Sequence, residues 1–248
     1  MAARALALLL TLGAGFWLKT LYSQAGADEL WWVLGPSAFV AELAGVALVP
    51  EPGAGYISRS AHMVVGPSCA GVNFLIACWI ALYLCTQTEV RRPRLPRLLA
   101  AMALSLCAAY LVTVSANGLR IALAAQLFAL DVYGESLTKA QAHRWLGVML
   151  YSTALLGSCL AARRLHNQSG RQLGAARRLS VGLCAYLGVS LGIPVVNRAF
   201  VSRPGQFAEH ALVTASGALG VLLLFLLAHR LCSPTLERGT DAWTNPRC

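Results

Sequence analysis

Three side chains that can do chemistry lie where polar sequence meets long apolar runs. Cys69 precedes an uncharged run that reaches Gln87, Arg120 follows a 19-residue apolar run, and His143 precedes another. A thiol becomes a nucleophile when a helix N-terminus or a nearby cation favours its thiolate. A guanidinium can stabilise a developing oxyanion, and an imidazole can relay protons at neutral pH. If these groups converge at one depth, they could carry out acyl transfer through sulfur.

Small and amide residues surround the same positions. Gly71 leaves room for a substrate carbonyl to approach Cys69, and Asn73, one helical turn later, either orients the thiol or bonds within the helix bundle. The Asn117-Gly118 pair suits a turn that aims Arg120 inward. The simpler alternative for Arg120 is that it extends its charge to lipid headgroups.

Composition places the chain among polytopic membrane proteins. Of its residues, 57% are hydrophobic and 12% are charged, which excludes an ordinary soluble core. A net charge of +10 would suggest nucleic acid in a soluble protein, but the arginines here cluster between apolar runs, where they attract anionic headgroups. We therefore expect the lipid bilayer, and no nucleic acid, as a partner. Five cysteines fall within the apolar runs and are expected to act as small hydrophobes: Cys78, Cys85, Cys107, Cys159 and Cys184.

Six segments are predicted to cross the bilayer as helices, because each can cover roughly 30 Å of hydrocarbon. They are residues 5–21, 70–87, 98–116, 145–162, 179–196 and 211–228. The expected fold class is an all-α polytopic integral membrane protein. Residues 1–228 would form a single transmembrane domain, and residues 229–248 a disordered cytoplasmic tail.

The arginine-rich connections predict the orientation of these spans. Segments 88–97 and 163–178 and the C-terminal tail carry the heaviest arginine clusters, so the positive-inside rule places all three in the cytoplasm. The start of the 70–87 helix and the stretch 117–144 then face the other side. Cys69, Arg120 and His143 are therefore expected on the extracytoplasmic face.

Two further apolar segments are expected not to span. Residues 118–130 are short and contain Arg120, which favours a re-entrant or interfacial helix. Residues 30–49 are long enough to cross, but Pro36 and Glu42 interrupt them, so we favour an interfacial segment. If they did cross, the count would be seven and the N-terminus would lie outside.

The stretch between these segments and Cys69 is rich in proline and glycine. Residues 50–55 read as a turn, and residues 56–65 could pair as a small hairpin that carries the chain into Cys69.

The remaining histidines leave alternatives to His143. His62 and His210 map to the same extracytoplasmic side, and the residues alone do not rank them against His143. His166 and His229 lie in basic cytoplasmic segments and are excluded by topology. Other polar residues beside the last extracytoplasmic loop, expected to be solvated, are Asn197, Arg198 and Glu209.

Three sequence blocks occur in a fixed order: SCAGVNFL, ANGLRIAL and AHRWLGVMLY. They resemble the signature blocks of the exosortase/archaeosortase family, and the short chain with its tail looks most like the exosortase K branch. The resemblance covers about residues 30 to 165. It selects His143 among the histidines, because only His143 heads a helix after the Asn-x-x-Arg block.

The resemblance implies a multi-pass cysteine protease/transpeptidase of the bacterial inner membrane that needs no cofactor or metal. Its site would comprise Cys69 as nucleophile, Arg120 as stabiliser of the oxyanion or thiolate, and His143 as general acid/base, supported by Gly71, Asn73 and Asn117. Its partners would be an exported protein with a C-terminal sorting helix and an acceptor nucleophile of unknown identity.

Two other classes of function compete with this interpretation. Cys69 with His62, His143 and His210 could form a metal or cofactor site, although their spacing matches no known ligand motif. A transporter or scaffold would need charges within several spans or an internal repeat, and the sequence shows neither.

Overall fold

A computed structural model describes residues 2–87, 94–130, 133, 138–165, 175–196, 201 and 204–232. The helices are α1 (Ala2–Gln24), α2 (Trp31–Leu43), α3 (Val72–Gln87), α4 (Leu95–Phe128), α5 (Lys139–Leu165), α6 (Ala175–Leu187), α7 (Ile193–Val196) and α9 (Pro204–Cys232). Short 3-10 helices occur at Asp28–Leu30 and Pro67–Cys69, and a π-helical turn at Gly188–Gly192 joins α6 to α7. The strands are β1 (Val49–Glu51), β2 (Gly55–Ser58) and β3 (Met63–Val65).

Within the described residues, six segments are long and apolar enough to cross a membrane. They are Ala2–Gln24, Pro67–Thr86, Leu95–Phe128, Lys139–Ala162, Arg177–Val196 and Pro204–Ala228. Each contains most or all of one predicted span, so the predicted all-α polytopic membrane fold is confirmed. Large apolar side chains such as Leu104, which is 71% exposed, point outward from these helices, as expected where the surrounding medium is lipid.

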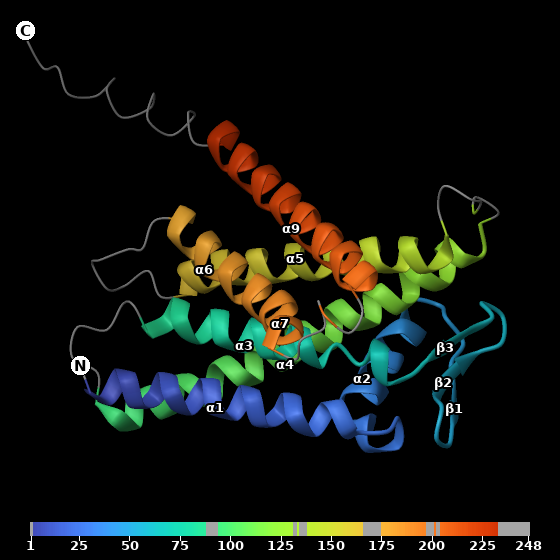
Figure 1. The fold of residues 1–248 in the computed structure, drawn as a ribbon, viewed down its shortest axis with the longest axis horizontal. Helices are drawn as coiled ribbons and strands as arrows, with labels where there is room; N and C mark the ends of the chain where they lie inside the picture. Colours follow the sequence, from blue (N-terminus) through green and yellow to red (C-terminus); the bar gives the residue numbers. More distant parts are fainter. Residues whose placement is uncertain are drawn as a thin grey trace, which may run out of the picture.

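The spanning helices alternate in direction, so that the bundle has two distinct ends (Figure 1). At one end α1 terminates, α3 begins, α4 terminates and α5 begins. At the other end α1 begins, α3 gives way to α4, and α5 gives way to α6. The helix ends nearest Cys69, Arg120 and His143 therefore lie together, opposite the ends that adjoin the two arginine-rich connections.

Helix α3 forms the centre of the bundle. It packs against α1, α4, α5 and α6, and its side chains are buried along most of its length. Cys78 and Cys85 on α3 and Cys159 on α5 are buried thiols, whereas Cys107 and Cys184 are exposed. Cys69 thus lies just before α3, the most buried of the spanning helices.

The expected separate helix at residues 118–130 is not observed. Helix α4 runs unbroken through 34 residues, a length of about 50 Å, which exceeds the roughly 30 Å hydrocarbon layer. The predicted turn at Asn117-Gly118 is also wrong, because both residues are helical. The backbone does not bend there because the Asn117 side chain bonds to another segment, and the missing side chain of Gly118 admits a neighbouring helix.

That neighbour is α2, which belongs to the segment 30–49 and does not span. Its 13 residues cover only about 20 Å, and the chain turns away at Gly45, where φ is +87°. Helix α2 packs on α4, and the Tyr110 hydroxyl donates a hydrogen bond of 2.6 Å to the Trp32 carbonyl. The expectation that residues 30–49 do not cross agrees with this short helix.

A three-stranded antiparallel sheet in the order β1-β2-β3 follows α2. The predicted hairpin is present as β2 and β3, in which Tyr56 pairs with Val65. Residues 50 and 51, predicted to form a turn, instead belong to the additional strand β1. The turn lies just beyond them, where the Gly53 amide donates to the Asp28 carboxylate at 3.0 Å.

Candidate active site

Cys69 lies in a bend between the sheet and α3. It ends the 3-10 helix Pro67–Cys69, and α3 begins only at Val72, so the expectation that a helix starts directly after the thiol is wrong. The chain turns at Gly71, where φ is +73°, a conformation that residues with a Cβ rarely adopt. A Cβ at Gly71 would also lie 3.1 Å from the Tyr151 hydroxyl oxygen. Glycine is therefore required for the bend that separates the thiol from the helix.

Hydrogen bonds from three directions hold this bend. The Cys69 amide donates to the Gly66 carbonyl at 2.9 Å. The Asn117 amide group on α4 donates to the Cys69 carbonyl at 2.7 Å, and the Tyr22 hydroxyl on α1 donates to the Pro67 carbonyl at 3.1 Å. The position of the thiol is thus defined relative to α1 and α4.

His143 on α5 faces the thiol. Its Nε2 atom lies 3.9 Å from the Cys69 Sγ atom and also forms a hydrogen bond with Nη2 of Arg120. Because a guanidinium only donates, Nε2 is the acceptor in that bond and carries a lone pair. The other ring nitrogen, Nδ1, is buried with no partner among the described residues. The acceptor nitrogen of the imidazole is therefore the one next to the sulfur.

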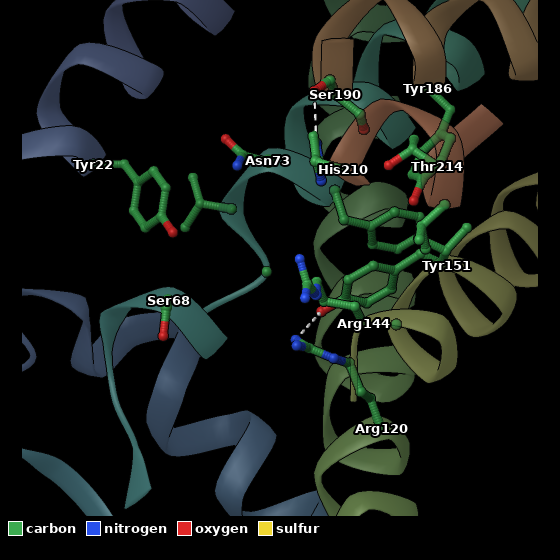
Figure 2. A pocket seen from close by; sticks show the side chains of 16 residues that line it. Tyr22, Ser68, Asn73, Arg120, Arg144, Tyr151, Tyr186, Ser190, His210 and Thr214 are labelled. Atoms are coloured by element: carbon green, nitrogen blue, oxygen red, sulfur yellow. Dashed lines mark hydrogen bonds between the residues drawn. The ribbon is translucent and has the colours of Figure 1, made fainter. Parts of the chain in front are cut away.

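Arg120 is held inside the bundle. The residue is only 9% exposed, and its Nη1 donates to the Tyr151 hydroxyl at 3.2 Å (Figure 2). Gly147 on α5 makes room for it, since a Cβ there would come 3.0 Å from the guanidinium Nε. A side chain that extended to lipid headgroups would be far more exposed, so this geometry disfavours that alternative.

Tyr151 links the guanidinium to the bend that holds the thiol. Its hydroxyl accepts from Arg120 and donates to the Asn117 side-chain carbonyl at 2.7 Å. Its ring stacks on Phe74 of α3, with centroids 4.4 Å apart and planes 9° apart. Sequence reasoning missed Tyr151, although a polar aromatic residue two helical turns after His143 in an apolar run was a usable signal.

A cavity of about 180 Å³ adjoins these residues. Figure 2 shows its lining, and Arg120 and Tyr151 lie on one side of it. Ser68 and Gly71, on either side of Cys69 in the chain, also line it. The other lining residues are Tyr22, Val72, Asn73, Phe74, Arg144, Gly147, Val148, Tyr186, Ser190, His210, Val213 and Thr214.

Two polar contacts tie α9 to the cavity. Arg144 on α5 forms a 2.6 Å ion pair with Glu209, whose side chain is still 40% exposed, as expected of a solvated residue. The Nε2 atom of His210 lies within hydrogen-bond distance, 3.1 Å, of the Ser190 carbonyl, as Figure 2 also shows. Helix α9 therefore contributes a wall of the cavity and not merely a membrane anchor.

The remaining candidate residues have varied positions. Asn73 is exposed and lines the cavity, whereas Asn117 is the amide that binds the Cys69 segment. His62 lies between β2 and β3 with a φ of +48°. Outside the described part of the chain lie Asn197, Arg198, His166, the side chain of His229 and residues 233–248 of the predicted tail.

A metal site was the main rival for these residues. Among the described residues, no group of three or more histidine, cysteine, aspartate or glutamate side chains could hold a metal ion. Of the four residues considered for such a site, Cys69 and His143 meet. His62 and His210 do not join them.

Comparisons with protein-family models, with curated proteins and with solved structures find no match for this chain.

Proposed function

We propose that this chain is a membrane-embedded cysteine peptidase or transpeptidase, resembling the exosortases, that cleaves the C-terminal sorting signal of exported proteins. The observation that carries the proposal is that Cys69 and Arg120, which are distant in the sequence, both contact the same nitrogen atom of His143. Nε2 of His143 lies 3.9 Å from the Cys69 sulfur and within hydrogen-bond distance of Arg120. A nucleophile beside a base, with a cation close enough to meet a developing negative charge, supplies the groups that acyl transfer through sulfur uses.

The charge of Arg120 supports this function further. The residue is 9% exposed and has no carboxylate partner among the described residues; its hydrogen-bond partners are an imidazole and a phenol. Burying a cation without a counter-charge is costly. An anion that forms during the reaction, a thiolate or an oxyanion, would supply the missing negative charge.

The proposed first half-reaction transfers the acyl group to sulfur. The hydrogen bond from Arg120 to His143 Nε2 opens, Nε2 takes the proton from the Cys69 thiol, and Sγ attacks the carbonyl carbon of the scissile peptide bond. Arg120 stabilises the resulting oxyanion. The carbon–nitrogen bond then breaks as His143 gives its proton to the leaving amine, which departs with the sorting tail. Cys69 is left as a thioester.

In the second half-reaction an acceptor amine or water attacks the thioester carbonyl. His143 takes a proton from this acceptor, and Sγ leaves as the thiolate and is reprotonated. The cleaved protein is released with a new amide bond or a free carboxylate. The acceptor would enter through the cavity that Ser68 and Gly71, the neighbours of Cys69 in the chain, help to line.

The substrate class and location follow from the same interpretation. The substrate is an exported protein that ends in a short motif, an apolar helix and a basic tail, and it docks laterally from the bilayer. Because the arginine-rich connections adjoin the opposite end of the bundle, the site would face the extracytoplasmic side of the bacterial inner membrane.

The test uses an epitope-tagged exported protein from the source organism that ends in such a signal, expressed with the wild-type enzyme or its variants. Cys69→Ala should abolish conversion of the full-length form to the cut form, measured by immunoblot. Cys107→Ala is the matched control, because Cys107 is an exposed free thiol whose loss leaves no cavity. Cleavage that persists in Cys69→Ala at equal membrane expression would reject the cysteine mechanism.

A further inference from the structure

The two edges of the small sheet differ in their capacity to bind another strand. Pro50 lies in β1, opposite Tyr56 of β2, and proline has no amide hydrogen to donate. Pro50 and Tyr56 therefore form a non-hydrogen-bonded pair, in which the backbone N–H of Tyr56 points toward β3. The outer edge of β1 carries the proline at the position where an outward-facing donor would otherwise stand.

The same alternation determines which residue of β3 faces outward. Tyr56 pairs with Val65, and Ile57 pairs with Val64. Because hydrogen-bonded and non-hydrogen-bonded pairs alternate along antiparallel strands, Val65 bonds to β2 while Val64 points its N–H and C=O away from it. The packing of Gly55 agrees: a Cβ on this residue of β2 would overlap the Val65 carbonyl oxygen, which places that oxygen on the β2 side.

The outer edge of β3 is thus available for pairing. Among the described residues, no backbone hydrogen bond outside the helices and strands involves Val64, and the residue is 56% exposed. Met63 and Val65 point to the opposite face and are buried, so the strand itself is anchored. Proteins commonly block exposed edges with proline or charge, as β1 does with Pro50, but β3 has neither.

This open edge leads directly to the candidate nucleophile. Gly66 follows Val65, and its carbonyl accepts the Cys69 amide at 2.9 Å. The bend between them is held by Tyr22 and Asn117. Five residue steps separate Val64 from Cys69, a reach of at most about 18 Å. An extended peptide paired with Val64 therefore needs at most about five residues to bring a carbonyl to the thiol.

We propose that the outer edge of β3 binds the substrate polypeptide as an added β-strand, through the backbone N–H and C=O of Val64, and so delivers the scissile bond to Cys69. Backbone pairing supplies affinity without reading sequence, and it orders an extended segment before the apolar helix. The inference rests on the proposed function for the identity of the peptide, but the binding step precedes and does not require cleavage.

The decisive variant is Val64→Pro. It removes the outward amide at a position where an edge strand tolerates proline, as β1 tolerates Pro50. Val64→Thr is the control, since it keeps the amide and the branched side chain shape. With the tagged exported protein described above, Val64→Pro should lower cleavage roughly tenfold, about the effect of one lost hydrogen bond, while Val64→Thr cleaves normally. Equal thermal unfolding of the two variants in detergent shows that the sheet is intact.

A cross-linking experiment separates this inference from catalysis. In Cys69→Ala enzyme, a photoreactive amino acid is placed at successive substrate positions before its apolar helix. Cross-links to the enzyme should alternate with a period of two, as side chains do along a strand, and should disappear with Val64→Pro but not with Val64→Thr. This cross-linking pattern would support strand addition even if the wild-type enzyme did not cleave the substrate. An absence of cleavage would reject only the proposed function. Cleavage and cross-linking that Val64→Pro leaves unchanged, or cross-links without alternation, would overturn strand addition.

Discussion

Arg120 is a cation enclosed among neutral partners, and its planar shape is used as well as its charge. Two nitrogen atoms of the guanidinium reach two different side chains, Nη1 reaching Tyr151 and Nη2 reaching His143. A lysine ammonium is a single point on a flexible stem and cannot reproduce this fork. The planar shape of the guanidinium therefore matters in addition to its positive charge.

Arg120→Lys should accordingly reduce cleavage about a hundred- to a thousandfold, the typical effect of losing one oxyanion donor. The measurement is accumulation of uncut substrate at matched membrane expression. Arg97→Lys, an exposed residue at the other end of α4, is the control and should cleave normally. Near-normal cleavage by Arg120→Lys would leave only its charge to explain its position.

Tyr151 bridges two polar groups through one hydroxyl. Tyr151→Phe keeps the ring stacked on Phe74 but leaves Asn117 without its donor and Arg120 without an acceptor. An unsatisfied buried group typically costs about 1–3 kcal/mol, so we expect a rate loss of roughly tenfold or more. Tyr110→Phe removes a comparable hydroxyl that bonds to the Trp32 carbonyl outside the site. Equal cleavage rates in the two variants would show that the Tyr151 hydroxyl has no role in positioning.

At the scale of elements, the crossing of α2 over α4 supports the site from behind. A Cβ on Gly118 would come 2.5 Å from the Val40 Cβ and 2.7 Å from the Ser37 carbonyl oxygen. Neither atom is the end of a flexible chain, so any side chain here must push α2 away. Because Asn117 precedes Gly118 and holds the Cys69 segment, the crossing and the site are mechanically connected.

Gly118→Ala should therefore destabilise the protein by about 1–3 kcal/mol, as overpacking typically does, and should also slow cleavage. Gly157→Ala on α5 is the contrasting variant, because nothing lies within 4 Å of a Cβ there. That substitution should be neutral or stabilising, since glycine inside a helix costs about 0.5–1 kcal/mol relative to alanine. The two are compared by thermal unfolding in detergent. Equal unfolding temperatures would mean that α2 is not closely packed at Gly118.

At the scale of the whole molecule, the length of α4 explains how the candidate site can lie at the end of the bundle opposite the arginine-rich connections. Helix α4 continues through Arg120 to Phe128. The chain therefore crosses the membrane only once between the connection before α4 and the candidate site. Both α3 and α5 therefore begin at the site end of the bundle (Figure 1). One orientation then places the helix ends that adjoin residues 88–93 and 166–174 on the side opposite Cys69 and His143.

Topology reporters check this orientation directly. Fusions after Arg94, after Arg171 and at the C-terminal tail should report the cytoplasm, because the positive-inside rule retains these clusters there. A fusion at Lys139, where α5 begins, should report the opposite face. A cytoplasmic signal at Lys139 would place His143 on the wrong side for an extracytoplasmic site and would contradict the proposed mechanism.

The six spans and the non-spanning segment 30–49 were predictable from sequence, because hydropathy is a local property and lipid requires each crossing segment to satisfy its own backbone. The hairpin formed by β2 and β3 was predictable for a similar reason, since turn residues act locally. Cys69, Arg120 and His143 were selected by their places at the edges of apolar runs and by the resemblance of three sequence blocks to those of a known family.

Only the tertiary structure decided how these residues meet. Helix packing determines that the Cys69 sulfur, 74 residues from His143 in sequence, lies 3.9 Å from its Nε2, and that Tyr151 connects Arg120 to Asn117. The break predicted at Asn117-Gly118 failed because amide and glycine residues, which favour turns in isolation, serve here as an inward hydrogen bond and a close helix crossing. Such roles depend on partners distant in the chain, so local sequence preferences do not reveal them.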